Sequence, residues 1–268
     1  MRRSSTIVFA ILLLSAPASA TESTDGERAF EQGRYSEAFA LLSEEHAAGD
    51  GRSTYFKARM LELRLADKRD PKLAGDLYLR SAETGYAPAF NRVGLMYLRG
   101  ELGQERDGRR ATDYFRKGAA ADDPNALFNL SRLYLAGQGV ARDEGQGVAL
   151  LKRAAAHDHI LALNTLGALY LKEPELDSKL QARGYFQRSS ALGNAAGLYQ
   201  MGLFHLHDGG KPENLVAAHK YFNLASTRGH SGARDALRNL TRQLSARDVE
   251  RAQSDARAFR AATSTEGP

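Results

Sequence analysis

Two closely spaced histidine pairs are the side chains of this chain whose type and spacing come nearest to metal chemistry. His157 and His159 are separated by one aspartate, and His205 and His207 by one leucine. Neutral imidazole is a preferred ligand of zinc, but a zinc site needs three or four converging ligands. Neither pair has an obvious third ligand beside it, so a zinc site would require the two pairs to meet in space.

The sequence lacks the common motifs of serine nucleophiles and of phosphate-binding loops. No serine is followed by lysine three residues later, and no G-x-S-x-G turn occurs. The Gly137-Gln-Gly139 stretch has neither a third glycine nor the lysine of a P-loop. Aspartate recurs beside such loops, but the oxygen ligands are too few for calcium and no EF-hand pattern is present. We therefore predict no metal ion and no cofactor.

The composition predicts an all-α protein. The 268 residues are rich in alanine, leucine and charged residues, contain no tryptophan or cysteine, and include 37 basic and 32 acidic side chains. The two signs of charge are interleaved along the chain, which is typical of a solvated surface and argues against a groove for nucleic acid. Because there is no cysteine, stability must come from helix packing rather than from disulfides.

Residues 1–20 have the pattern of a secretory signal peptide. Arg2 and Arg3 precede an apolar run from Ile7 to Leu14, and Ala18-Ser19-Ala20 supplies the small residues of a cleavage site. The run is shorter than the roughly 20 apolar residues that span a bilayer, which argues against a retained anchor. We expect cleavage after Ala20 and a periplasmic or secreted protein. Cleavage would lower the net charge from +5 to +3.

A repeat with a period near 36 residues organises the remaining chain. The small residues that open its copies are Ser53, Ala89, Ala126, Ala162, Gly197 and Ala233. Positions four, five and eight residues later are mostly apolar, small and aromatic, so they share one face of a helix. Glycine takes the small position at Gly94, Gly167 and Gly202, although it costs about 1 kcal/mol inside a helix. We infer close helix approach there, at a junction between repeats.

Each copy continues into a second helix with its own apolar positions. An aspartate or asparagine, which we expect to be the N-cap, precedes it, namely Asp70, Asp107, Asp143, Asp177 and Asn214. Each second helix ends at a residue expected to be left-handed, namely Gly85, Asp122, Asp158, Gly193 or Gly229. In this register one histidine pair follows a second helix and the other ends a first helix. The two pairs therefore fall on opposite edges of the stack, which argues against a shared zinc site.

The combined pattern A-x-x-x-[LV]-G-x-x-Y, G-x-G-V-x-x-D and A-x-x-[YL]-[FL]-x-x-A-A-x-x-G resembles the Sel1-like repeat family, relatives of the tetratricopeptide repeats. The resemblance covers about residues 53–229 and is weakest in the first copy, where Lys57 takes an apolar position. It implies an all-α fold, an α/α solenoid of about five helix-turn-helix repeats with capping helices at both ends. We assign 1–20 to the signal peptide, 21–52 to an N-terminal partial repeat, 53–88, 89–125, 126–161, 162–196 and 197–232 to the repeats, 233–260 to C-terminal capping helices and 261–268 to a disordered tail.

The predicted binding surface is the part of the first helices that the core does not use. Side chains two, three, six and nine residues after each opening position should face the concave side of the superhelix. Aromatic residues, asparagine, glutamine and arginine there have the composition of protein-binding hot spots. The predicted partner-binding residues are Tyr55, Arg59, Asn91, Arg92, Phe128, Asn129, Arg132, Asn164, Tyr199 and Gln200. The alternative is that the aromatic side chains pack on the neighbouring repeat.

The sequence thus predicts an exported, non-enzymatic scaffold that binds a protein or peptide in its concave groove, without nucleic acid and without membrane insertion after signal cleavage. The resemblance to Sel1-like repeats implies adaptor roles in envelope assembly, signalling or export. It also leaves a cell-wall hydrolase of the β-lactamase type as an alternative, because some Sel1-like proteins have been regarded as penicillin-binding enzymes. A structural spacer without a groove is the second alternative.

Overall fold

The computed structural model describes residues 23–65, 70–208 and 211–265, and every regular element within these ranges is a helix. The helices are α1 (Asp25–Glu31), α2 (Tyr35–Ala47), α3 (Gly51–Leu63), α4 (Pro71–Glu83), α5 (Ala87–Arg99), α6 (Gly108–Ala120), α7 (Pro124–Ala136), α8 (Glu144–Ala156), α9 (Ile160–Tyr170), α10 (Leu176–Ala191), α11 (Ala195–His207), α12 (Pro212–Thr227), α13 (Ser231–Thr241) and α14 (Ala246–Thr265). The predicted signal peptide lies outside the described residues. Within the described part, no helix is long and apolar enough to cross a bilayer.

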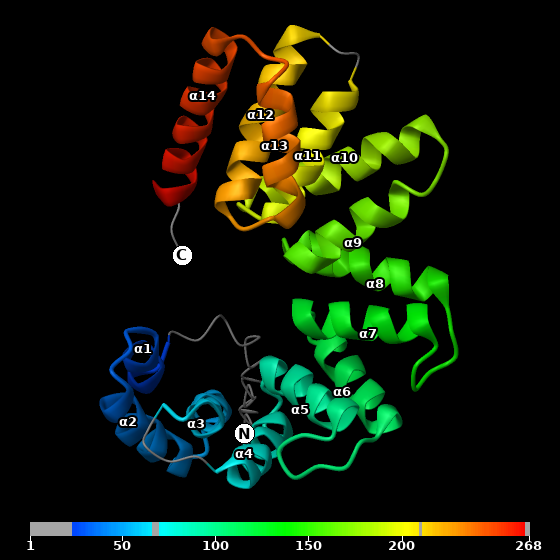
Figure 1. Cartoon of the computed structure of the whole chain (residues 1–268). Coiled ribbons are helices and arrows are strands. Elements are labelled where there is room, and N and C mark those ends of the chain that lie inside the picture. The colour runs from blue at the N-terminus through cyan, green and yellow to red at the C-terminus, as the bar shows by residue number, and fades with distance from the viewer. Residues whose placement is uncertain (1–22, 66–69, 209–210, 266–268) are drawn as a thin grey trace, which may run out of the picture.

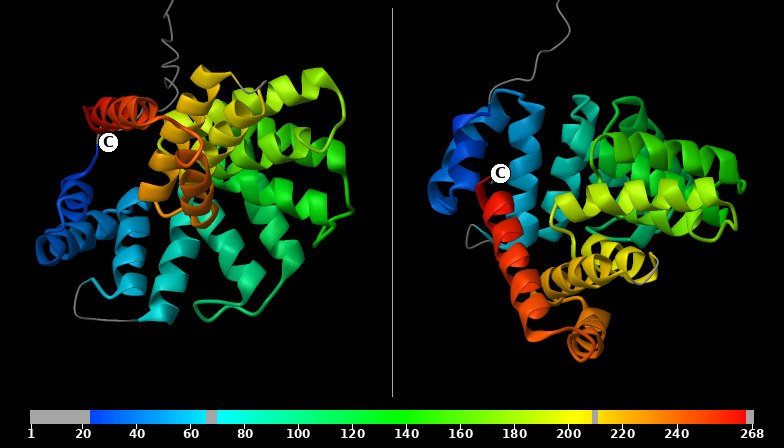
Figure 2. Two further views of the ribbon diagram at one scale, coloured as in Figure 1. Left: turned by 45° about the horizontal axis from the view of Figure 1, so that its top comes forward. Right: turned by 90° about the horizontal axis from the view of Figure 1, so that it is seen from above.

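The helices follow one another along an arc, with α1 to α4 at one end and α12 to α14 at the other (Figure 1). Neighbouring helices in the sequence pack against each other from α1 to α13, and α14 folds back onto α12. Two further views show the same stacking of hairpin on hairpin (Figure 2). Such a quasi-linear array, in which each unit contacts mainly its neighbours, is the α/α solenoid that the repeat pattern predicted.

The core extends through the repeats as a series of hydrophobic clusters. The opening residues that are alanine or serine are fully buried, namely Ser53, Ala89, Ala126, Ala162 and Ala233. A single hydrophobic cluster extends from Ala58 in α3 to Leu166 in α9. In the weak first copy, the ammonium group of Lys57 lies 5.8 Å from the ring centroid of Phe39, so α3 keeps the helical register despite the charge.

The glycine of a first helix faces an aromatic ring on the second helix of its own hairpin. A Cβ built on the glycine would stand 2.5 to 2.7 Å from the nearest ring carbon. The pairs are Gly94 and Phe115, Gly167 and Phe186, and Gly202 and Phe222. The predicted close approach is therefore present, but its predicted location was wrong. It lies inside each hairpin instead of between repeats, because the phenylalanine of the second helix fills the space that the missing side chain leaves.

Three of the five predicted N-caps of the second helices are correct. The side chains of Asp70, Asp107 and Asp143 accept backbone N–H bonds at the starts of α4, α6 and α8. Asp177 and Asn214 were wrong, because α10 and α12 each begin earlier and place these residues inside the first turn. Proline at the start of α12 fixes the helical φ before Asn214 is reached. Within α10, the acidic Asp177 instead lies near the positive end of the helix dipole.

The turns that follow the second helices all contain a left-handed residue, as predicted. Gly85, Gly193 and Gly229 have positive φ, and so do Asp122 (φ 58°) and Asp158 (φ 54°). Both aspartates also link two repeats. Asp122 is 2.8 Å from a guanidinium nitrogen of Arg153 and 2.7 Å from Nε2 of His157, both of which belong to the following repeat.

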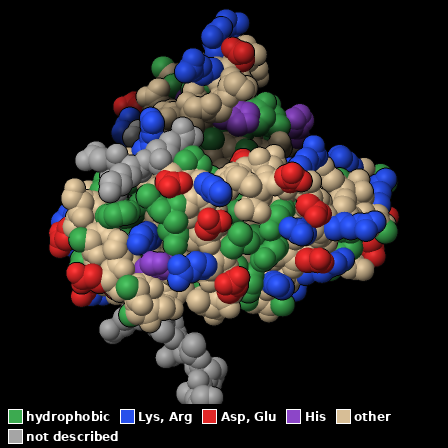
Figure 3. Space-filling model, turned by 90° about the horizontal axis from the view of Figure 1, so that it is seen from below, with side chains coloured by type: hydrophobic (Ala, Val, Ile, Leu, Met, Phe, Trp, Pro, Cys, Tyr) green, Lys and Arg blue, Asp and Glu red, His purple; other side chains and the backbone are tan. Residues whose placement is uncertain are grey.

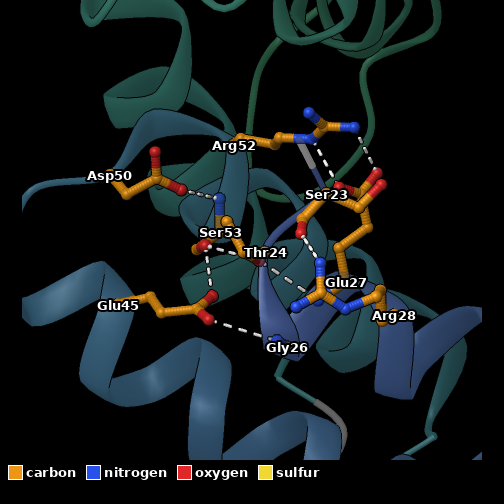
Figure 4. Close-up of polar contacts among 9 residues, drawn as sticks. All are labelled: Ser23, Thr24, Gly26, Glu27, Arg28, Glu45, Asp50, Arg52 and Ser53. Carbon is orange, nitrogen blue, oxygen red and sulfur yellow. Dashed lines mark hydrogen bonds and ion pairs between the residues drawn. The ribbon is translucent and has the colours of Figure 1, made fainter. Parts of the chain in front are cut away.

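The N-terminal end of the array is closed by α1, which is held by polar contacts to α2 and α3 (Figure 4). One carboxylate oxygen of Glu45 accepts the backbone N–H of Gly26 at 3.1 Å, and the other accepts the hydroxyl of Ser53 at 2.5 Å. Arg52 pairs with the buried Glu27 at 2.6 Å. Two charged contacts therefore join the beginning of the described chain to α2 and α3.

The C-terminal end is closed by α14. Ser245 and Asp248 bond to each other across the start of the helix, with the backbone N–H of Asp248 donating to the Ser245 hydroxyl at 3.2 Å. Ala252 and Ala256 are buried on one side of α14. The helix extends to Thr265, so the tail predicted from residue 261 is helical over its first five residues. Residues 266–268 lie outside the described part.

Candidate functional site

The side chains two residues after the opening positions lie between repeats. At four junctions each contacts the residue that caps, or directly precedes, the next first helix. These pairs are Tyr55 and Tyr86 (ring centroids 5.3 Å apart), Phe128 and His159 (4.8 Å), Tyr199 and His230 (4.1 Å), and Asn164 with Asn194, whose Nδ2 and Oδ1 are 3.0 Å apart. Asn91 differs, since its Oδ1 accepts from Nδ2 of Asn129 at 2.8 Å. Packing is thus one role of the predicted aromatic residues, and partner contact through their exposed parts stays a prediction.

The N-caps of the first helices were missed in the sequence. Side chains of Asp50, Asp123, His159 and Asn194 accept N–H bonds at the starts of α3, α7, α9 and α11. In the sequence, each of these four caps is a polar residue that stands three positions before the opening residue of its helix. His159 caps through Nδ1, which accepts from the N–H of Ala162 at 3.2 Å and so must be unprotonated. Burial lowers the pKa of His159, which favours this neutral form.

Arg92 lies in an ion-pair network that joins α3, α4 and α5. Its guanidinium bonds to both carboxylate oxygens of Glu62 and lies 3.1 Å from Glu101, while the Tyr78 hydroxyl donates to Glu62 at 2.8 Å. Burial alone would raise the pKa of Glu62, but the bonds from Arg92 and Tyr78 hold it below its ordinary value. The charge of Arg92 is therefore largely neutralised within the protein.

The remaining predicted residues differ in how accessible they are. The guanidinium of Arg59 stacks on Phe30 at 5.1 Å from the ring centroid, which ties α3 to the N-terminal cap. Arg132 is exposed on α7, with its guanidinium 5.9 Å from the ring of Phe128. Gln200 is half-buried on α11, where it lines a surface hollow. Arg132 and Gln200 are therefore well placed to meet a partner.

Two surface hollows occupy equivalent positions in different repeats. The first, of about 600 Å³, is lined by Glu62, Leu63, Pro71, Arg92, Leu95, Arg99, Glu101 and Leu102. The second, of about 540 Å³, is lined by Leu171, Leu176, Lys179, Leu180, Arg183, Gln200, Leu203, Phe204, His207 and Asp208. In both, one wall is formed by the residues three, six and ten positions after the opening residue of a first helix, which is α5 in the first hollow and α11 in the second. The other wall is formed by the preceding hairpin, namely by the end of its first helix (α3 or α9) and by part of its second helix (α4 or α10).

The histidine pairs take part in packing and turn contacts. His157 pairs with Asp122, His205 stacks on Tyr221 with ring centroids 5.4 Å apart, and Nδ1 of His207 donates to the carbonyl of Leu203 at 2.7 Å. Across residues 23–65, 70–208 and 211–265, no three histidine or acidic side chains are grouped so as to hold a metal ion.

Charge on the surface is mixed where it can be seen directly. On the face seen from below the view of Figure 1, basic and acidic side chains alternate among hydrophobic ones (Figure 3). Such a face offers many separate polar contacts but no single-sign field, which is the surface expected for protein binding more than for a polyanion.

The repeat architecture and its glycine, turn and hairpin geometry agree with a known family. The Sel1 repeat model matches residues 58–86, 87–123, 124–159, 162–194 and 195–230, which is more than half of the chain. The chain belongs to the Sel1 repeat family. Sel1 repeat proteins generally mediate protein–protein interactions and are typically non-catalytic scaffolds.

The Sel1 fold is also found in solved structures. A Sel1 repeat protein from Oxalobacter formigenes superposes with a TM-score of 0.72 at 24% identity, over 87% of this chain and 98% of that one. A protective antigen from uropathogenic Escherichia coli superposes with a TM-score of 0.59 at 19% identity, over 85% of this chain and 59% of that one. At these identities the likeness concerns the fold alone.

Curated relatives are longer than this chain. The mouse DAP3-binding cell death enhancer 1 is 28% identical over 173 residues, which are 64% of this chain and 34% of that protein. Chitin synthase regulatory factor 4 of Schizosaccharomyces pombe is 26% identical over 208 residues, 69% of this chain and 32% of that protein. The chain thus spans about a third of the length of these relatives.

Proposed function

We propose that this Sel1 repeat protein is an exported adaptor that holds a protein partner along the first-helix face of its solenoid, on the concave side. The observation that carries the proposal is the recurrence of a surface hollow at equivalent positions of two repeats. A repeated binding position along one side suits an extended or multi-point partner, because each junction adds its own contacts. Relatives named for the proteins that they bind or regulate are consistent with this role.

Export to the periplasm, and a role in envelope assembly, signalling or export, belong to the same proposal. Support comes from the basic, apolar and small-residue segments of residues 1–20. If the protein is exported, its periplasmic form begins at Thr21, which N-terminal sequencing of the fractionated protein would show. A protein that stays in the cytoplasmic fraction with its N-terminus intact would contradict export.

Partner capture tests the binding surface. The chain from residue 21 would be used to recover cross-linked proteins from envelope extracts, which are then identified by mass spectrometry. Arg132→Glu and Gln200→Ala change accessible first-helix side chains, whereas Arg109→Glu changes an exposed residue on the second helix α6. We expect one dominant partner, lost with the first two variants and kept with the third, at unchanged melting temperatures. Loss with Arg109→Glu alone would place binding on the other face.

A further inference from the structure

The hollow between α9, α10 and α11 has an apolar wall open to solvent. The side chains of Leu176 and Leu180 on α10 are 72% and 58% exposed, and Leu171 at the end of α9 is 38% exposed. Leu203 and Phe204 of α11, both half-buried, line the opposite wall. Single exposed leucines are common on protein surfaces, but several that converge on one hollow indicate a contact surface.

The charges around this hollow are less fully compensated than those of its equivalent at Arg92. There, Glu62 and Glu101 neutralise the arginine. In the second hollow, Lys179 forms no ion pair with any described residue, and Arg183 has only Asp208, at 3.8 Å. The lysine, arginine and aspartate side chains that line the hollow are Lys179, Arg183 and Asp208, so these groups leave an excess of one positive charge.

The sequence of α10 sets the apolar and the charged groups in two adjacent rows. Leu176 and Leu180 are four residues apart, as are Lys179 and Arg183, so each pair lies on one line along the helix. An occupant that inserts apolar side chains beside the leucine row therefore brings its neighbouring side chains to the cationic row. This arrangement selects for apolar residues flanked by a carboxylate.

We propose that this hollow binds an amphipathic helix of a partner protein, which inserts leucine-like side chains between α10 and α11 and pairs a carboxylate with Lys179 and Arg183. The proposal rests on the adaptor function and specifies its partner. A helix is favoured because helix-in-groove recognition uses apolar anchors spaced by one turn, which matches the spacing of the two rows. An extended peptide added to a sheet edge has no counterpart in the described part of the fold, where every element is a helix.

A library of random twelve-residue peptides displayed on phage tests the chemistry of the occupant. The target is the chain from residue 21. We expect enriched peptides to combine apolar residues at helical spacing with aspartate or glutamate, and to become helical on binding. Enrichment of basic peptides, or no enrichment at all, would overturn the proposal.

The location is tested with a selected peptide and two matched variants. Leu180→Asp places a charge in the leucine row, and we expect at least tenfold weaker binding by fluorescence anisotropy. Leu161→Asp is the control, because Leu161 is 56% exposed, close to the 58% of Leu180, yet lies outside the hollow. It should change affinity less than twofold. Equal effects of the two variants would overturn the proposed site.

The charge pairing is tested by a reciprocal exchange. Lys179→Glu should weaken binding of the acidic peptide about fivefold or more, and a peptide with lysine in place of its acidic residue should prefer the Lys179→Glu protein. No recovery in this exchange would contradict the pairing. A dimer of the unliganded chain that dissociates with Leu180→Asp in sedimentation would show a second copy in the hollow and overturn the proposed occupant.

The outcomes separate this site from the broader function. Peptide binding that is lost with Arg132→Glu but not with Leu180→Asp would reject the hollow and leave the adaptor function standing. An envelope partner that is captured equally by wild type and Leu180→Asp would do the same. Failure to capture any envelope partner would instead count against the adaptor function itself, even where Leu180-dependent peptide binding supports the hollow.

Discussion

The ring of Phe186 lies against the backbone of Gly167, so that a Cβ built on Gly167 would stand 2.7 Å from the ring. The same relation recurs at Gly94 and at Gly202. Glycine is a poor helix former, but at these positions it is required because the phenylalanine ring of the second helix leaves no room for a side chain. The small-residue position is a packing feature of the repeat, which explains why it recurs without being part of a binding surface.

Gly167→Ala should destabilise the protein. Alanine improves helix propensity by about 1 kcal/mol, but the methyl group would press on the Phe186 ring, and overpacking of this kind costs typically 1–3 kcal/mol. The matched control is Gly184→Ala in α10, where an added Cβ has no neighbour within 4 Å, and it should stabilise the protein by up to about 1 kcal/mol. Urea unfolding measures both, and equal shifts in the two variants would refute the ring contact.

Asp122 should be replaceable by glycine but not by alanine. Its φ of 58° is left-handed, which strains any residue with a Cβ by about 1 kcal/mol or more. Glycine removes that strain and gives up only exposed contacts with Arg153 and His157, each of which is worth at most about 1 kcal/mol. Alanine loses the same contacts and keeps the strain. We therefore expect Asp122→Gly to be more stable than Asp122→Ala by about 1 kcal/mol in chemical denaturation. The reverse order would contradict a strained turn.

His159 should make part of the stability depend on pH. Burial lowers its pKa in the folded state below the ordinary value of 6.5, so the unfolded chain binds the proton more readily. The stability contributed by the neutral cap is therefore complete above the unfolded-state pKa and is lost as the pH falls through the lower pKa of the folded state.

The variant His159→Asn isolates this effect, because asparagine is also a good N-cap and does not titrate. At pH 8 it should be less stable than wild type by about 1 kcal/mol, since the contact with Phe128 is lost. At pH 5 the difference should shrink, because only the wild type has a histidine to protonate at this position. Urea midpoints at pH 5, 6.5 and 8 would measure it, and parallel profiles would exclude His159 as the titrating cap.

Arg92 and Arg132 should respond differently to substitution, although the sequence assigned them the same role. Arg92→Ala leaves Glu62 partly buried without its main partner and should cost roughly 2 kcal/mol, less than a fully buried pair would because both side chains keep some solvent contact. Arg132→Ala changes an exposed side chain and should stay within about 0.5 kcal/mol. Thermal melts compare the two. A destabilisation by Arg132→Ala as large as that by Arg92→Ala would contradict the assigned environments.

Most of the fold could be predicted because the repeat multiplies each signal. The opening residues, the glycine positions and the left-handed turns recur in several copies, so a single atypical residue such as Lys57 did not hide the register. The starts of α10 and α12 could not be predicted from the same columns. Both helices are longer than their counterparts, and their first turns are set by local residues outside the repeat pattern.

The candidate site was less predictable, because the same face of the first helices carries both side chains that pack on the next repeat and side chains that are exposed to solvent. Tyr199 and Arg132 both fall outside the core columns, yet Tyr199 stacks on His230 while Arg132 is exposed. Whether such a side chain is packed or exposed depends on the residue that it meets on the next repeat, about 30 positions away in the sequence. A helical wheel drawn for one helix does not show that residue. The apolar wall at Leu176 and Leu180 was missed for a related reason, since it lies on a second helix outside the surface considered.

Glu45→Ala should loosen the N-terminal cap while leaving the rest of the array intact. The carboxylate accepts bonds from the backbone of Gly26 in α1 and from Ser53 in α3, so its removal takes away the polar link through which α2 holds α1, while the Arg52–Glu27 pair to α3 stays. In a repeat array, terminal units open at lower free energy than central ones. Hydrogen exchange of residues 25–31 should become about tenfold faster, with α5 to α11 unchanged. Glu44→Ala, an exposed neighbour on the same helix, should have no such effect. Uniformly faster exchange along the chain would show that the cap and the array unfold as one unit.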